Sequence, residues 1–260
     1  MIEINHATVV FAGSGKDPHT AYAPIHSIFE SRGDVRYVAQ ETLYDQNGLR
    51  PNIIDDLNKR LDHYNELTIA GDSIGTLAAY GLAIASEQRR STRLMLLDGP
   101  IGADHLKDEK ETIRISHLRG LDRITNTDLL EHWRNSNIVQ ESHFIRKHLS
   151  PEELEWFTAD MEARRKFELT TLGGQAVYLA NYATKDTLSA ETPAIYLQSK
   201  FDALLSQPAT AEAWKERIPH LEVQEVAGSN AHASTTIYPR AWRRSVIGAF
   251  NHLDNISRVA

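Results

Sequence analysis

Short apolar segments alternate with longer helical patterns over most of the chain, and this alternation constrains the fold more than any other feature. The apolar segments, rich in β-branched residues and bounded by turn residues, are 7–13, 35–40, 66–71, 93–98, 194–199 and 222–228. The helical patterns are 23–33, 52–64, 74–88, 208–218 and 239–254. Because crossover helices join parallel strands, the chain is predicted to form an α/β fold with an open, mostly parallel, doubly wound sheet covered by helices on both faces.

The alternation of predicted strands and helices is interrupted after the fourth predicted strand. The next segment shows helical patterns such as "TDLLEHWRNSN" and "LSPEELEWFTADMEARRKF", and no convincing strand. In the second pattern Ser150 is placed as a helix N-cap and Glu153 completes a capping box. We therefore expect a helical cap or lid over 104–188, inserted into a core made of 1–103 and 189–260.

Composition and charge restrict the classes of function. The 260 residues suffice for a large apolar core, and the net charge of -7 comes from mixed acidic and basic residues without a basic face. Nucleic acid is therefore not an expected partner. The first residues lack the features of a secretory signal and no apolar run reaches membrane-spanning length, so we expect a cytoplasmic protein without a membrane anchor. The absence of cysteine excludes disulfides, thiolate metal sites and a cysteine nucleophile.

The stretch "LTIAGDSIGTLAAYGLAIA", residues 67–85, places Ser73 between Gly71 and Gly75. An apolar predicted strand precedes it, and an Ala-rich helical pattern without charge until Glu87 follows. A tight turn without a catalytic role could show the same small residues. In a doubly wound sheet, however, reacting groups gather beyond the carboxyl ends of the strands, and this position favours a nucleophile.

Other polar residues occupy equivalent positions after later predicted strands. Asp98 follows the fourth strand, Asp202 follows the fifth within "SKFDALLS", and His232 follows the last within "AGSNAHAST". A serine, an acid and a histidine thus stand at strand ends in the order Ser, Asp, His. This combination is typical of a nucleophile, the base that activates it and the acid that orients the base.

With these residues the chain resembles the α/β-hydrolase superfamily over nearly its whole length. The pentapeptide "GDSIG" at 71–75 matches the G-x-S-x-G nucleophile elbow of that family, and the order of the three groups agrees. The resemblance implies Ser73 as the nucleophile, His232 as the general base and Asp202 as the acid that orients the imidazole. Asp98 is the alternative acid, because some members carry it one strand earlier.

The resemblance also implies an oxyanion hole made of backbone N–H groups. Ile74, directly after the nucleophile, supplies one donor, and alignment with the family's His-Gly motif makes Ser14 the second, with Gly13 as the close alternative. Here Ala12 stands where relatives often carry the histidine. Since the donors belong to the backbone, this change leaves the expected chemistry intact.

Two other interpretations of the glycine-rich loop fail. "GSGK" lacks the serine or threonine that a phosphate-binding loop needs after Lys16, and Pro18 stands where a dinucleotide fingerprint requires glycine. No His-x-His-x-Asp or His-Glu-x-x-His cluster occurs. We therefore expect neither a cofactor nor a metal.

The expected cap holds many aromatic residues: Trp133, Phe144, Trp156, Phe157, Phe167, Tyr178 and Tyr182. Most should pack the cap helices together, while a few could line a pocket for an apolar acyl or alcohol group. Arg164, Arg165 and Lys166 are interpreted as a solvated helix face, with contact to a carrier phosphate as the alternative.

These features favour a serine hydrolase that cleaves a carboxylic ester or thioester, or a lactone, of a small-molecule metabolite through an acyl-Ser73 intermediate. The same triad could instead perform acyl transfer or hydrolyse a carbon–carbon bond. A ligand receptor without catalysis is the alternative from another class, although a receptor has no evident need for all three groups. The expected partner is the small-molecule substrate, and a homodimer is left open.

Overall fold

The computed structural model describes residues 5–106, 127–136, 138–202, 204–205, 207–232 and 234–257. Its main sheet has six strands in the order β2-β1-β5-β6-β7-β8, and every neighbouring pair is parallel. The strands are β1 (His6–Phe11), β2 (Asp34–Val38), β5 (Glu66–Asp72), β6 (Ser91–Leu97), β7 (Ala194–Ser199) and β8 (Glu222–Val226). The open parallel sheet and its six strands are thereby confirmed.

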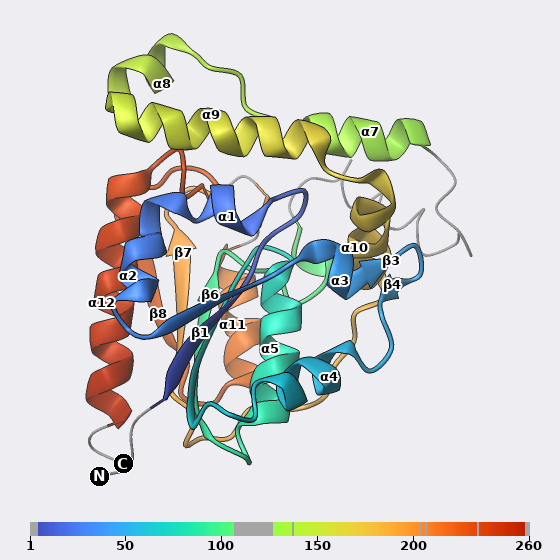
Figure 1. The fold of residues 1–260 in the computed structure, drawn as a ribbon, viewed down its shortest axis with the longest axis vertical. Helices are drawn as coiled ribbons and strands as arrows, with labels where there is room; N and C mark the ends of the chain where they lie inside the picture. Colours follow the sequence, from blue (N-terminus) through green and yellow to red (C-terminus); the bar gives the residue numbers. More distant parts are fainter. Residues whose placement is uncertain are drawn as a thin grey trace.

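Helices cover both faces of this sheet (Figure 1). One face packs against α4 (Ile53–Arg60), α5 (Gly75–Ser86) and α11 (Gln207–Arg217); the other packs against α2 (His26–Glu30) and α12 (Pro239–Ser257). Successive strand residues point to opposite faces, so Val9 joins the first apolar cluster and Val10 the second. Because helices cover both faces, the central strands β1, β5, β6 and β7 are buried at nearly every position, whereas the edge strands β2 and β8 are partly exposed.

The elements before β5 differ in detail from those expected. The predicted helix over 23–33 is two short pieces, the 3₁₀ helix η1 (Ala23–Ile25) and α2, and Pro24 lies at the start of the first piece. Further short elements were not predicted: α1 (Pro18–Ala21), α3 (Gln40–Leu43), β3 (Tyr44–Asp45) and β4 (Gly48–Leu49). Their two to four residues are too few to produce a readable period in the sequence.

Among the described residues between β6 and β7, the regular elements are helices. They are η2 (Ala103–His105), α7 (Thr127–Ser136), α8 (His143–His148), α9 (Pro151–Lys166) and α10 (Leu169–Asn181). We call α7 to α10 the helical segment. The predicted capping box at the start of α9 is confirmed by reciprocal hydrogen bonds between Ser150 and Glu153. Residues 107–126 of the predicted cap lie outside the described residues.

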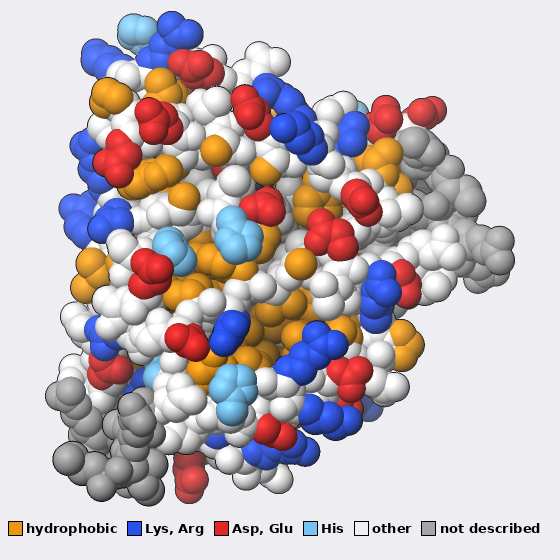
Figure 2. All heavy atoms as spheres, in the orientation of Figure 1, with side chains coloured by type: hydrophobic (Ala, Val, Ile, Leu, Met, Phe, Trp, Pro, Cys, Tyr) orange, Lys and Arg blue, Asp and Glu red, His pale blue; other side chains and the backbone are white. Residues whose placement is uncertain are grey.

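Charged side chains are interspersed on the surface. On the face drawn in Figure 2, lysine and arginine alternate with aspartate and glutamate. Among the described helices, none combines the length and apolar character that a membrane crossing requires.

Candidate active site

The turn between β5 and α5 holds Ser73 in a constrained backbone conformation. Its φ of 48° lies in the left-handed region, and its N–H donates to the carbonyl of Leu97 over 2.9 Å. A Cβ at Gly71 would lie 2.6 Å from the carbonyl oxygen of Gly75, and one at Gly75 would lie 2.5 Å from two backbone oxygens of the β1 end. Both glycines of the pentapeptide are therefore required by close packing of the elbow against β1 and α5.

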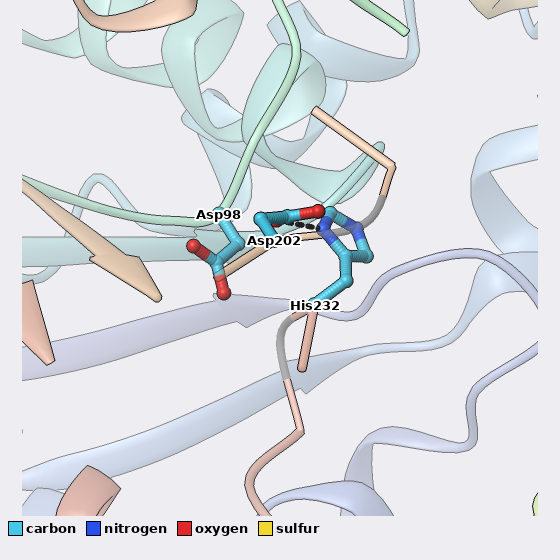
Figure 3. A group of neighbouring side chains, drawn as sticks. All are labelled: Asp98, Asp202 and His232. Carbon is cyan, nitrogen blue, oxygen red and sulfur yellow. Dashed lines mark hydrogen bonds and ion pairs between the residues drawn. The ribbon is translucent and has the colours of Figure 1, made fainter. Parts of the chain in front are cut away.

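Three strand-end loops bring Ser73, His232 and Asp202 together. The Oγ of Ser73 lies 2.8 Å from Nε2 of His232, and Nδ1 of the same imidazole lies 2.6 Å from Oδ2 of Asp202. Figure 3 shows the contact between the aspartate and the imidazole. A continuous hydrogen-bonded chain thus joins a hydroxyl, an imidazole and a carboxylate.

The electrostatics of this chain favour a charged aspartate. Burial opposes the charge on Asp202, but His232 and the N–H groups of Leu204 and Leu205, at 2.7 and 2.9 Å, outweigh burial and lower the pKa of the carboxyl. Burial also disfavours imidazolium at His232, but the two aspartates Asp202 and Asp98 outweigh that effect and raise the pKa of His232. The imidazole is therefore disposed to hold a proton taken from a neighbouring hydroxyl.

Asp98, the alternative acid, lies close to this chain but is engaged differently. One carboxylate oxygen of Asp98 lies within 4.8 Å of a carboxylate oxygen of Asp202 and of a ring nitrogen of His232 (Figure 3). Its two carboxylate oxygens accept hydrogen bonds from the N–H and the hydroxyl of Ser199, at 2.6 and 2.5 Å. Burial, with the nearby charge of Asp202, raises the pKa of Asp98. The contact with Nδ1 of the imidazole is made by Asp202.

Asp98, Asp202 and His232 together offer two carboxylates and an imidazole, which are acceptable ligands for a metal ion. Within the described part of the chain, these three residues form the cluster of potential metal ligands whose atoms lie close to one another. Each carboxylate oxygen already accepts from the protein: those of Asp98 from Ser199, and those of Asp202 from backbone N–H groups and from the imidazole. The donor set therefore fits a hydrogen-bonded triad better than a metal centre.

Ser14 and Ile74 line the same cavity as Ser73 and His232. Within the described part of the chain, neither residue's N–H donates to a protein acceptor. A Cβ at Gly13 would lie 2.8 Å from that of Ser73, so the loop after β1 passes directly against this serine. Both expected oxyanion donors thus lie where the chain approaches the serine.

A buried ion pair ties this loop to the elbow. The ammonium of Lys16 contacts Oδ2 of Asp72, the residue before the nucleophile, and both side chains are buried. Sequence reasoning considered Lys16 only as part of a phosphate loop and gave Asp72 no partner. The two lie far apart in the chain, and nothing local in the sequence indicates the pairing.

Two buried glutamines also hold this loop. We call residues 12–16 the oxyanion loop, after the role that the resemblance implies for Ser14. Gln40 donates to the carbonyl of Ala12 over 2.7 Å, Gln175 of α10 donates to Gln40 over 2.8 Å, and Gly15 N–H donates to Gln175 over 3.3 Å. This closed chain of amides connects the helical segment with the oxyanion loop, and sequence reasoning missed both glutamines.

Ser73 opens into a cavity of about 560 Å³ between the sheet and the helical segment. Its apolar lining includes Ile74, Trp133, Val139, Met161, Leu179 and Leu205. Of the aromatic residues considered, Trp133 faces the cavity, Phe157 and Phe167 are buried, and Phe144 is 52% exposed. The interpretation of Arg164 as part of a solvated face is wrong: its side chain is 11% exposed and lines the cavity, because the carboxylate of Asp160 holds it inward.

Sequence comparisons find no relative: no family model matches the chain, and no curated protein matches it. Solved structures do match. A structure from a study of carboxylesterases of Nitrososphaera gargenis matches with a TM-score of 0.64 and 16% sequence identity, and the match covers 98% of this chain and 92% of the other. A malate-bound thermophilic esterase from Thermogutta terrifontis matches with a TM-score of 0.64 and 17% sequence identity, and the match covers 96% of this chain and 90% of the other. The enol-lactonase from Burkholderia xenovorans LB400 matches with a TM-score of 0.63 and 16% sequence identity, and the match covers 95% of this chain and 92% of the other. With the sheet order and the elbow, these matches show that the chain has the α/β-hydrolase fold.

Proposed function

We propose that the protein is a serine hydrolase that cleaves a carboxylic ester, a thioester or a lactone of a small molecule through an acyl-Ser73 intermediate. The observation that carries this proposal is the hydrogen-bonded chain from Ser73 through His232 to Asp202 at the floor of a largely apolar cavity. The structurally similar proteins are named as a carboxylesterase, an esterase and an enol-lactonase, and these names refer to ester and lactone bonds, which supports the proposal.

Acylation begins when Nε2 of His232 takes the proton of Ser73 as Oγ attacks the carbonyl carbon. The carbonyl electrons move onto oxygen, and the N–H groups of Ile74 and Ser14 bind the resulting oxyanion. One such donor contributes about 10²- to 10³-fold in rate. When the tetrahedral intermediate collapses, the bond to the leaving group breaks and that group takes the proton from His232. The charged carboxylate of Asp202 stabilises the transient imidazolium.

Deacylation repeats these steps with water. His232 takes a proton from the water as its oxygen attacks the acyl carbon. When the second tetrahedral intermediate collapses, the bond between the acyl carbon and Oγ of Ser73 breaks, and His232 donates the proton to Oγ. The product is the free carboxylic acid. If an alcohol or amine takes the place of water, the same steps give acyl transfer, so the acceptor decides the outcome.

In this proposal the helical insertion between β6 and β7 is a cap over the active site. α7, α9 and α10 each contribute side chains to the cavity wall. The boundaries 104–188 for the cap, with 1–103 and 189–260 as the core, remain our proposed division. The cap determines which acyl and leaving groups fit, while the core carries the chemistry.

Labelling with a fluorophosphonate probe tests the nucleophile. The protein should be labelled stoichiometrically at Ser73, and Ser73→Ala should remove the label. Ser136→Ala is the matched control, because Ser136 lines the same cavity from α7 and should not affect labelling. Absence of label on the wild-type protein, or equal labelling of Ser73→Ala, would refute the proposal.

A substrate panel then separates the reactions. Aryl esters, acyl-CoA thioesters and lactones are supplied with and without an acceptor alcohol. Release of free acid in all cases identifies a hydrolase, whereas acyl transfer to the alcohol in preference to water identifies a transferase.

A further inference from the structure

The cavity wall carries fixed positive charge. Among its described lining residues the permanently charged side chains are Lys16 and Arg164, and no aspartate or glutamate is among them. Lys16 comes from the oxyanion loop, and Arg164 comes from α9. Two separate elements thus present cations to the space into which Ser73 opens.

Among the described residues, each of these cations pairs with an aspartate that lies behind the wall. Asp160 is fully buried, and its Oδ2 accepts from Nη2 and Nε of Arg164 at 2.9 and 3.2 Å and from the hydroxyl of Thr236 at 3.0 Å. Asp72, the partner of Lys16, is also fully buried. Neither carboxylate lines the cavity, so each ion pair directs its positive end toward the space and its negative end away from it.

This arrangement fixes Arg164 in one orientation. The contact with Asp160 and the aspartate's second contact with Thr236 restrict the long arginine side chain, so a ligand need not order it on binding. In a cavity lined mainly by apolar groups, a guanidinium attracts a carboxylate more strongly than in water and can bind it through paired hydrogen bonds.

We propose that Arg164, supported by the charge of Lys16 on the wall of the same cavity, binds a carboxylate that the substrate carries away from its scissile carbonyl group. The inference rests on the proposed function and names its substrate class: an ester, thioester or lactone in which the acyl part or the leaving group bears a carboxylate next to an apolar chain. The apolar wall receives the chain, and Arg164 receives the charge.

Turnover of isosteric substrates tests this class. The para-nitrophenyl half-ester of adipic acid is compared with the corresponding ester of adipamic acid, in which a carboxamide replaces the carboxylate. A second pair carries the carboxylate or the carboxamide on a phenyl leaving group of hexanoic acid. In at least one pair the charged member should show kcat/KM about 10- to 100-fold higher, the range of a charge-assisted hydrogen bond in a protected site. Equal or lower values for both charged members would overturn the inference.

Variants locate the preference. In the double variant Asp160→Asn with Arg164→Gln, which removes both charges and leaves no buried aspartate unpaired, the charged-to-neutral ratio should fall to about 1. Arg164→Lys keeps the ion pair and should lower the ratio by a smaller factor. Arg165→Gln, on the exposed face of the same helix, should retain the wild-type ratio. A full preference in the double variant, with Ser73 still labelled by fluorophosphonate, would contradict the assignment.

A binding measurement separates this inference from the proposed reaction. Calorimetry on Ser73→Ala should show that monomethyl adipate binds at least about 10-fold more tightly than methyl adipamate. The difference should vanish in a protein that combines Ser73→Ala with Asp160→Asn and Arg164→Gln. If Ser73 is not labelled but this difference is present, the proposed reaction fails and the carboxylate site stands. If Ser73 is labelled but the difference is absent, the site fails and the reaction stands.

Discussion

The strand ends and the helical segment build the two sides of one cavity in different ways. At the strand ends the backbone sets the geometry: Ser73 has a left-handed φ, Gly75 contacts β1, and Asp202 accepts two backbone N–H groups. On the helical side, the wall includes Trp133 and Arg164, and an ion pair between the side chains of Arg164 and Asp160 positions the guanidinium. The comparison indicates that the strand ends fix the chemistry, whereas the helical segment can change selectivity by exchanging side chains.

Removing the imidazole should give the largest effect of a side-chain change at the strand ends. His232→Ala is expected to lower kcat/KM by about 10⁴- to 10⁶-fold, because within the described part of the chain the imidazole of His232 is the base that contacts the hydroxyl of Ser73. His132→Gln, on the helical side of the same cavity, should lower kcat/KM by less than about 10-fold. Steady-state kinetics on one ester checks both. Comparable losses would mean that the two sides of the cavity do not differ as described.

The two neighbouring acids should differ in the next largest effect. Asp202→Asn should lower kcat by about 10³- to 10⁴-fold, because Nδ1 of His232 loses the carboxylate that orients it and stabilises its charge. Asp98→Asn should lower kcat by less than about 10-fold, since its oxygens are bound to Ser199 rather than to the imidazole. The reverse order would make Asp98 the functional acid.

The link between the two sides can be broken at Gln175. Gln175→Leu removes its hydrogen bonds to Gly15 and Gln40 and should loosen the oxyanion loop. We expect kcat to fall by about 10- to 100-fold with little change in KM, because the donors act on the oxyanion and not on the bound ester. Asn181→Ala, exposed near the end of the same helix, is the control. A rise in KM at constant kcat would show that Gln175 shapes only the pocket.

The smallest expected effect is a shift in pH dependence. kcat/KM should rise with pH as His232 loses its proton, because only the neutral imidazole can accept the proton of Ser73. Asp202 and Asp98 both raise the pKa of His232, so removal of either charge favours the neutral ring and moves this rise to lower pH. A pH profile of Asp98→Asn, the more active variant, measures the shift. A move to higher pH would contradict the charge arrangement.

The sequence predicted the site best where its features are local. The elbow depends on small residues within 71–75, and Asp202 and His232 follow strands that are recognisable from their apolar runs. The pairs Lys16–Asp72 and Gln40–Gln175 depend instead on the meeting of distant segments, which no local pattern records. The two to four residues of α3 and of the β3–β4 hairpin likewise give no readable period.

The interpretation of Arg164 was wrong for a related reason. In the sequence it precedes two further basic residues, and a run of this kind is typical of a solvated face. The structure turns Arg164 inward because Asp160 lies one helical turn before it and is fully buried by the loop that carries Thr236. The direction of a helix face depends on what packs against it, which the run of charges does not contain.

Acylation of Ser73 is the step on which the proposed function depends, and it can be observed in the pre-steady-state reaction with a para-nitrophenyl ester. We expect a rapid burst of one nitrophenolate per chain, with the acyl group found by mass spectrometry on the peptide that contains Ser73. Ser73→Ala should show neither the burst nor the adduct. Turnover without a burst and without any acyl adduct under conditions that slow deacylation, or an adduct on another residue, would contradict the account.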